Sequence, residues 1–194
     1  MRKSPPELKK RARKLNDQVI RSKAKYVLCW LQQNIRAFDN AAIDAAIATA
    51  NKLKLPVVVY HGLGQKYPNA NDRLHQFIIE ASKSLAPEVE KRGLRCINYI
   101  ERAGKYEKGL VYRLAKDAAA IITDDQPAYV GRWQAETVAA KADIAVIAVD
   151  ASCVVPMNEF PYLTEANAFF RRAHAASRKI SERENGIVAG DFAL

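Results

Sequence analysis

Residues 25–40, KYVLCWLQQNIRAFDN, decide the fold of this chain, because a continuous apolar run opens there into a polar loop. The run, residues 26–31, holds six consecutive apolar residues rich in β-formers, which is typical of a parallel strand buried on both faces. The polar loop follows the carboxyl end of that strand, where open α/β sheets place their ligand crevice. We therefore predict a central strand over 26–31 and a ligand site directly after it.

Outward from this stretch, strand-like and helix-like runs alternate along the chain. We predict four further strands, at residues 57–60, 94–100, 118–123 and 144–149. The helices predicted between the five strands run from Asp39 or Asn40 to before Pro56, from Asn69 or Asn71 to Arg92 with Pro87 inside, and over 106–117 and 130–142. Parallel neighbours require right-handed crossovers, so this alternation predicts a doubly wound, five-stranded parallel sheet of the α/β class.

The two ends of the chain differ in character from this body. Of the net charge of +10, residues 1–25 carry +8, from ten Lys and Arg against two acidic residues. Leu8, Ala12 and Leu15 recur at helical spacing, so residues 1–24 are interpreted as a basic amphipathic helix that docks on the body, residues 25–156. Residues 157–194 are interpreted as an exit segment, with a helix over 163–180 and no strong period after 184.

The basic end has two interpretations. It is either a solvated face or a surface that contacts nucleic acid or another acidic partner, weakly and without sequence preference. The nucleic-acid interpretation rests on a cluster of five cations: Lys9, Lys10, Arg11, Arg13 and Lys14.

Cysteine usage and hydropathy indicate the compartment. Cys29, Cys96 and Cys153 are odd in number and too far apart for a C-x-x-C pair, which favours free thiols in a reducing compartment. The sequence has no run of about 18 apolar residues, so we expect a cytoplasmic chain that does not enter a membrane.

Several common catalytic motifs are missing from the sequence. Gly62-Leu63-Gly64 lacks the third glycine of a dinucleotide fingerprint and is interpreted as a turn. Neither a P-loop nor a G-x-S-x-G elbow occurs, and the three histidines are scattered, so we assign no metal and no catalytic residue.

The candidate site is therefore the polar rim at the carboxyl ends of the strands, where open sheets collect ligands. Its alternative is structural: Asp39 and Asn40 cap a helix, Arg36 pairs with an acid, and the other residues are ordinary loop polars. Trp30 and Trp133 are interpreted as core residues. The predicted ligand-binding residues are Gln33, Arg36, Asp39, Asn40, His61, Gly62 and Asp124.

A series of short segments, in order and at consistent spacing over residues 15–156, resembles the amino-terminal α/β domain of DNA photolyases, especially class II cyclobutane pyrimidine dimer photolyases. The segments are Leu15-Asn16, residues 26–32, Arg36 with Asp39-Asn40, residues 55–59, Gly62-Leu63, Tyr67-Pro68, Asn71 with Arg73, Phe77 and Glu80, Arg92-Gly93, Thr123-Asp124, Trp133 and residues 154–156.

This resemblance implies a Rossmann-like domain that holds an antenna chromophore such as a deazaflavin. In the family, a larger helical domain binds FAD and the DNA lesion, and the excited reduced flavin splits the pyrimidine dimer. The chain resembles the first domain only, so FAD is expected through a missing domain or a partner in trans, and the chain alone is expected to be inactive in light-driven DNA repair.

Two other functions remain alternatives at this point. One is a universal-stress-like nucleotide-binding module, and the other is a small-molecule-binding α/β enzyme such as a hydrolase or transferase. The segment 124–127 after the fourth predicted strand, Asp-Asp-Gln-Pro, is acidic and glycine-free, which argues against ATP because carboxylates repel phosphates.

Overall fold

The computed structural model of the chain describes residues 6–65, 67, 69–102, 109–126, 129–153, 156 and 157. The chain divides into two compact units, residues 1–151 and 152–194, and the architecture below is that of the first. The predicted helix at 163–180 and the tail after 184 lie outside the described residues. Within the described ranges, no helix is both long and apolar enough to cross a membrane.

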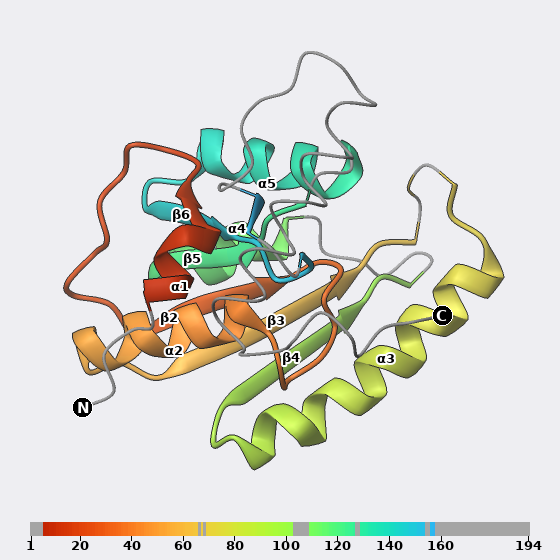
Figure 1. Cartoon of the computed structure of the whole chain (residues 1–194). Helices are drawn as coiled ribbons and strands as arrows, with labels where there is room; N and C mark the ends of the chain where they lie inside the picture. The colour runs from red at the N-terminus through yellow and green to blue at the C-terminus, as the bar shows by residue number, and fades with distance from the viewer. Residues whose placement is uncertain are drawn as a thin grey trace, which may run out of the picture. The chain divides into compact units, whose positions relative to one another are not determined.

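A six-stranded sheet forms the centre of the first unit (Figure 1). The strands lie side by side in the order β1-β6-β5-β2-β3-β4, with β1 antiparallel to its neighbour and all others parallel. From β2, the next two strands, β3 and β4, are added on one side. The chain then crosses back, and β5 and β6 are added on the other side of β2. The order in which strands are added therefore reverses between β2 and β5, although these two strands are parallel. The strands are β1 (Ala12–Lys14), β2 (Tyr26–Leu31), β3 (Val57–Leu63), β4 (Arg95–Ile100), β5 (Ala118–Asp124) and β6 (Ala145–Val149).

The doubly wound fold and its five parallel strands are confirmed, although β3 continues to Leu63 and so includes two of the three residues interpreted as a turn. The predicted basic helix is present at the amino-terminal end, but it is shorter than predicted. The helix α1 (Pro6–Arg11) ends before Ala12, and the chain continues as strand β1, whose residues pair with 147–149 of β6. Without β1, the edge of β6 would present unpaired backbone groups. The hydrogen bonds that residues 12–14 make with these groups favour a strand more than their weak helical period favours a helix.

Helices cover both faces of the sheet (Figure 1). One face carries α2 (Ala41–Leu53) and α3 (Asp72–Lys91), and the other carries α4 (Leu110–Ala115) and α5 (Tyr129–Lys141). Pro87 lies inside α3, which is continuous. α2 ends at Leu53 and is capped by Lys54, which adopts the left-handed conformation with φ 57° two residues before Pro56.

Two hydrophobic cores lie on opposite faces of the sheet, and strand β2 contributes to both. Cys29 and Leu31 belong to the core under α2 and α3, whereas Leu28 and Trp30 belong to the core under α4 and α5. The burial of β2 on both faces confirms that residues 26–31 form the central strand, and it fixes the point at which the polar loop 32–40 begins.

Candidate functional site

Asp124, the last residue of β5, is buried between the carboxyl ends of β5 and β2, where the strand order of the sheet reverses. Its Oδ2 accepts hydrogen bonds from the backbone nitrogens of Gln32, Gln33 and Asn34 at 3.3, 2.9 and 2.8 Å. Burial raises the pKa of this carboxyl above its usual value, and the three backbone bonds oppose that rise. The loop after β2 is therefore fastened to β5 by the protein's own carboxylate.

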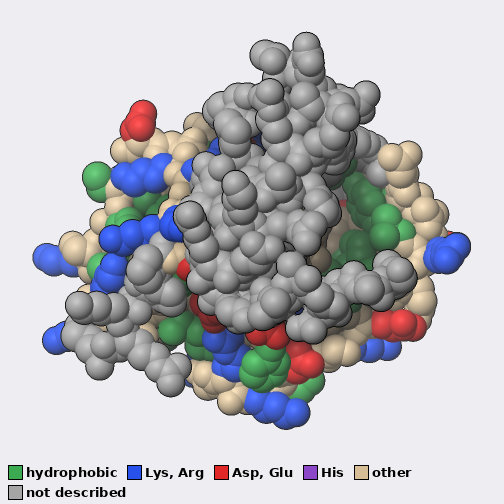
Figure 2. All heavy atoms as spheres, viewed as in Figure 1, with side chains coloured by type: hydrophobic (Ala, Val, Ile, Leu, Met, Phe, Trp, Pro, Cys, Tyr) green, Lys and Arg blue, Asp and Glu red, His purple; other side chains and the backbone are tan. Residues whose placement is uncertain are grey.

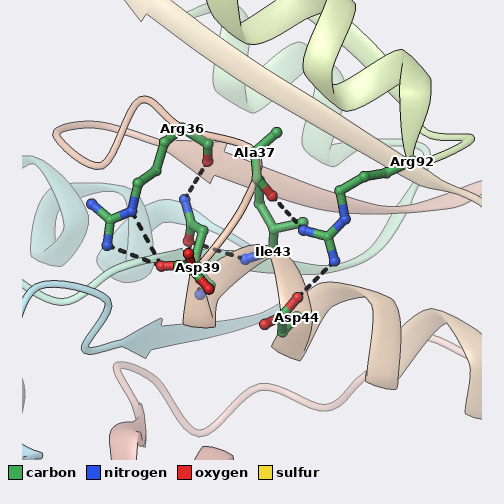
Figure 3. Close-up of polar contacts among 8 residues, drawn as sticks. Arg36, Ala37, Asp39, Ile43, Asp44 and Arg92 are labelled. Carbon is green, nitrogen blue, oxygen red and sulfur yellow. Dashed lines mark hydrogen bonds and ion pairs between the residues drawn. The ribbon is translucent and has the colours of Figure 1, made fainter.

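Arg36 holds the same loop from the solvent side. Its Nε and Nη2 donate to the Asp39 carbonyl oxygen at 3.1 and 3.0 Å (Figure 3). Its Nη1 donates to Asn34 Oδ1 at 3.0 Å. Nη2 also donates to the Ala151 carbonyl oxygen at 2.8 Å. These acceptors are carbonyl and amide oxygens rather than the acid expected in the structural alternative. That Arg36 engages a ligand stays a prediction.

Asn40 is fully buried and caps helix α2. Its Oδ1 accepts from the backbone nitrogens of Ala42 and Ile43 at 3.0 and 3.3 Å, which satisfies two first-turn donors. Its Nδ2 donates at 2.9 Å to the carbonyl oxygens of Asn34 and Arg36. Asn40 thus fills the capping role that the sequence left open between it and Asp39.

A second arginine, which sequence reasoning missed, joins this loop to α3. Arg92, at the end of α3, donates to the Ala37 carbonyl oxygen and, at 2.7 Å, to Asp44 Oδ1 of α2 (Figure 3). Its guanidinium also lies 5.8 Å from the centroid of the Phe38 ring. Arg92 lies 55 residues from Ala37, so no local sequence pattern indicates the contact.

His61 of β3 points toward α3. Its Nδ1 lies 2.9 Å from Ser82 Oγ, and that hydroxyl donates to the Ile78 carbonyl oxygen at 2.8 Å, which assigns the ring proton to Nδ1. Burial lowers the pKa of His61 to about 4. The ring is therefore neutral at pH 7 and joins the strand to the helix.

A pocket of about 330 Å³ lies between the opposite face of the sheet and the helices α4 and α5. Of the predicted site residues, only Gly62 lines it. Its walls are rich in aromatic side chains from three strands and two helices, namely Trp30, Tyr60, Tyr99, Tyr112 and Trp133.

The two tryptophans of the chain both line this pocket. Trp30 is also a core residue, as predicted, but Trp133 is 66% exposed, so its interpretation as a core residue is wrong. Trp30 and Tyr60 are register partners on neighbouring strands, with Trp30 near the carboxyl end of β2 and Tyr60 in the middle of β3. The signal that the sequence offers for the pocket is one aromatic residue in each of these two neighbouring apolar runs.

Polar groups without partners gather beside the first turn of α5. Within the described residues, Gln32 Oε1, Asp124 Oδ1 and Gln126 Nε2 are buried and lack hydrogen-bond partners. A Cβ on Gly131 would lie 3.0 Å from Gln126 Cγ and 3.7 Å from Gln32 Oε1, so these side chains pack directly against the helix backbone. Gln32 also lines the pocket, so one end of the pocket is polar, and a ligand there could donate a hydrogen bond to Gln32 Oε1.

The basic segment has fewer available charges than its sequence suggests. Arg13 makes a bidentate pair with Asp125, both bonds at 2.7 Å, and Arg11 pairs with Glu7 at 3.1 Å. The side chain of Asp125 is only 7% exposed, so Arg13 has a structural role. Lys9, Lys10 and Lys14 are exposed. Figure 2 shows Lys and Arg side chains along the left of the view, where α1 and the following loop lie.

Comparison with known proteins gives both a family and individual relatives. Residues 27–183 match the DNA photolyase family. The chain is 31% identical over 147 residues to a deoxyribodipyrimidine photo-lyase from Methanothermobacter thermautotrophicus (strain Delta H), a match that covers 76% of this chain and 32% of that protein. The chain therefore spans about a third of the length of that relative.

Solved structures with a similar fold include a universal stress protein from Archaeoglobus fulgidus, with a TM-score of 0.44 and 22% identity over 64% of this chain and 98% of that one. A universal stress protein from the same organism in complex with dAMP has a TM-score of 0.43 and 20% identity, over 66% of this chain and 99% of that one.

Proposed function

This chain belongs to the DNA photolyase family, and from that premise we propose that its α/β unit is an antenna domain, which holds a light-absorbing chromophore. A bound chromophore of this kind absorbs light and passes the excitation energy to a flavin. The observation that carries the proposal is the aromatic pocket between the sheet and the helices α4 and α5.

The size and lining of the pocket suit a single fused-ring chromophore such as a deazaflavin. Ligand pockets span roughly 300–1,000 Å³, and about 330 Å³ lies at the lower end of that range, which favours one ring system over a dinucleotide such as FAD. Aromatic walls stack on a planar ring, and Gln32, whose buried Oε1 has no hydrogen-bond partner among the described residues, offers an acceptor to the polar edge of that ring.

In this proposal, one of the residues predicted from the sequence lines the pocket, and the others hold the surrounding loop and strands in place. Gly62 belongs to the pocket wall. Arg36, Asp39 and Asn40 hold the loop that carries Gln32 and Gln33, and Asp124 fastens the start of that loop to β5. His61 holds β3 against α3. In this proposal their substitution affects the chromophore through the shape of the pocket.

We further propose that the polypeptide by itself does not repair pyrimidine dimers. Repair requires a flipped dimer held against a reduced flavin, because the lesion cannot be reached within the base stack. FAD would be supplied by a helical domain or by a partner in trans. Illumination of dimer-containing DNA with the chain and FAD, without such a partner, should leave the dimers intact.

A nucleotide-binding function is less favoured by the geometry. The N–H groups of the loop after β2, which could otherwise bind a phosphate, are already bound to the Asp124 carboxylate. A phosphate placed there would have to compete with that buried acid for the same N–H groups.

The test is a titration followed by tryptophan fluorescence, because both tryptophans line the pocket. We expect saturable quenching by a deazaflavin and none by ATP. Trp133→Ala should weaken binding about tenfold through lost stacking, with Trp30 as the remaining reporter. The matched control is Phe77→Ala on α3, since Phe77 is 67% exposed and does not line the pocket. Absence of saturable quenching, or equal affinity for the two variants, would contradict the proposal.

A further inference from the structure

We propose that the chain forms a weak symmetric dimer through strand β4, in which the β4 strands of two copies pair antiparallel and join their sheets. β4 is the last strand in the sheet order, so within the described residues one of its sides has no strand beside it. The occupant of that side would be a second copy of the same strand.

The backbone of β4 is arranged to accept such a partner. The N–H of Glu101 donates to the Leu63 carbonyl oxygen of β3 at 2.9 Å, so residue 101 points its backbone groups inward. In a parallel pair, backbone direction alternates along the strand. The N–H and C=O groups of Cys96, Asn98 and Ile100 therefore point outward, away from β3.

The two edges of the sheet differ in how well they are protected. The opposite edge, β1, has three residues, two of them cationic, which blunts it against further pairing. β4 has six residues, and only Arg95 among them is charged. Ile97 and Ile100 are 36% and 39% exposed. A long edge strand with exposed apolar residues is a template for another strand.

One antiparallel register satisfies every outward backbone group and is also self-complementary in charge. With Asn98 opposite its own copy, Cys96 faces Ile100 of the second copy, and these outward residues form the hydrogen-bonded pairs. The intervening pairs place Arg95 opposite Glu101 and Ile97 opposite Tyr99. Since the two-fold axis repeats each pair, the dimer would contain two Arg95–Glu101 contacts and two Ile97–Tyr99 contacts.

This arrangement would also bring the two pockets together. Tyr99 and Glu101 line the pocket, and side chains two apart on a strand share a face, so Arg95 of the second copy would reach the Glu101 rim. The contact surface of one strand pair is small, which predicts a reversible, concentration-dependent dimer.

The test uses the self-complementarity of the charged pair and measures mass by sedimentation equilibrium over a concentration series. Arg95→Glu and Glu101→Arg should each weaken self-association about tenfold, because each variant places like charges at both symmetric contacts. An equal mixture of the two variants should associate as the wild type does, since every contact in the mixed dimer again joins opposite charges. The double variant should do the same.

Two further variants test whether association depends on pairing at β4 rather than on the net charge of the protein or on its folding. Lys141→Glu on α5 makes the same charge change as Arg95→Glu but on a helix that packs against β6, and it should not alter association. Ile100→Pro removes an outward N–H while keeping the bonds to β3, so it should abolish association and leave the circular dichroism spectrum unchanged. A wild type that stays monomeric into the millimolar range, or a mixture that associates no better than its components, would overturn the proposal.

Discussion

Replacing Asp124 with alanine removes the acceptor that the backbone N–H groups of three consecutive residues share. The Asn34 N–H is buried, whereas those of Gln32 and Gln33 are partly exposed and can be rehydrated in the variant. A hydrogen bond to a charged group contributes about 1.5–3 kcal/mol, and an unsatisfied buried donor costs about 1–3 kcal/mol. The alanine also relieves the desolvation of a buried carboxylate, which offsets part of this loss. We expect Asp124→Ala to lower the free energy of unfolding by about 2–4 kcal/mol at pH 7.

Asp124→Asn is the matched control because it keeps an oxygen acceptor for the three N–H groups, removes the charge and replaces only Oδ1, which has no hydrogen-bond partner in the described part of the chain, by an amide nitrogen. We expect it to cost less than the alanine variant at pH 7. Burial raises the folded-state pKa of Asp124 above its unfolded value of about 3.9. Between these two pKa values the folded chain binds more protons, so this carboxyl's contribution to stability falls as pH rises and is constant above the folded pKa. The asparagine variant should lack that fall.

Urea denaturation of wild type, Asp124→Ala and Asp124→Asn from pH 3.5 to pH 8 measures both effects. The difference in unfolding free energy between wild type and Asp124→Asn should shrink as pH rises through the titration of Asp124. If the alanine variant is as stable as the asparagine variant at pH 7, the carboxylate does not fasten the loop. If the difference does not change with pH, the raised pKa is refuted.

Four other predictions concern stability and surface charge. His61 has a pKa of about 4 when folded and about 6.5 when unfolded. Its contribution to stability is therefore complete above pH 6.5 and falls by about 3 kcal/mol as the pH drops to 4. In urea titrations, the free energy of unfolding of His61→Gln should lack this fall. Asn40→Ala should cost about 2–4 kcal/mol. Asn40→Asp keeps the cap oxygen but should not restore this loss, because its second carboxylate oxygen would face the carbonyl oxygens of Asn34 and Arg36 in a buried site. Arg13→Ala should destabilise by about 1–3 kcal/mol, less than a fully buried pair, because it leaves the buried Asp125 unpaired. Lys14→Glu should instead leave stability unchanged and weaken salt-dependent binding to a mixed-sequence duplex; equal binding by wild type and Lys14→Glu would rule this face out.

The parts of the fold that sequence reasoning predicts are those with a strong local signal. Strand β2 is buried on both faces, so its apolar run is continuous, and the helix caps at Asn40 and Asn71 are specified by residues immediately before each helix. Strand β1 lacks such a signal. Its three residues become a strand only because β6, more than 130 residues later, leaves an edge beside them.

For the candidate site too, some features could be predicted from the sequence and others could not. The rim residues after β2 and β5 do come together, because parallel strands end at one edge, and Asp124 meets the loop after β2 there. Their hydrogen bonds to one another could not be predicted, since a polar residue near a sheet edge can equally face a ligand. Trp133 shows the opposite error, because a tryptophan in a helical pattern is usually core and only the packing of α5 leaves it exposed.

The position of the pocket follows from the position of Asp124. In open α/β sheets the reversal point offers backbone N–H groups to an anion, but here the buried carboxylate already accepts those groups. The space that remains is the pocket between the sheet and the helices α4 and α5, which is lined by aromatic residues of β2, β3 and β4. A ligand in that space meets aromatic side chains and the amides of Gln32 and Gln134 rather than phosphate-binding N–H groups. In the antenna function that we propose, the carboxylate that already occupies these N–H groups would leave the adjacent pocket, and not the end of β2, as the place for a chromophore.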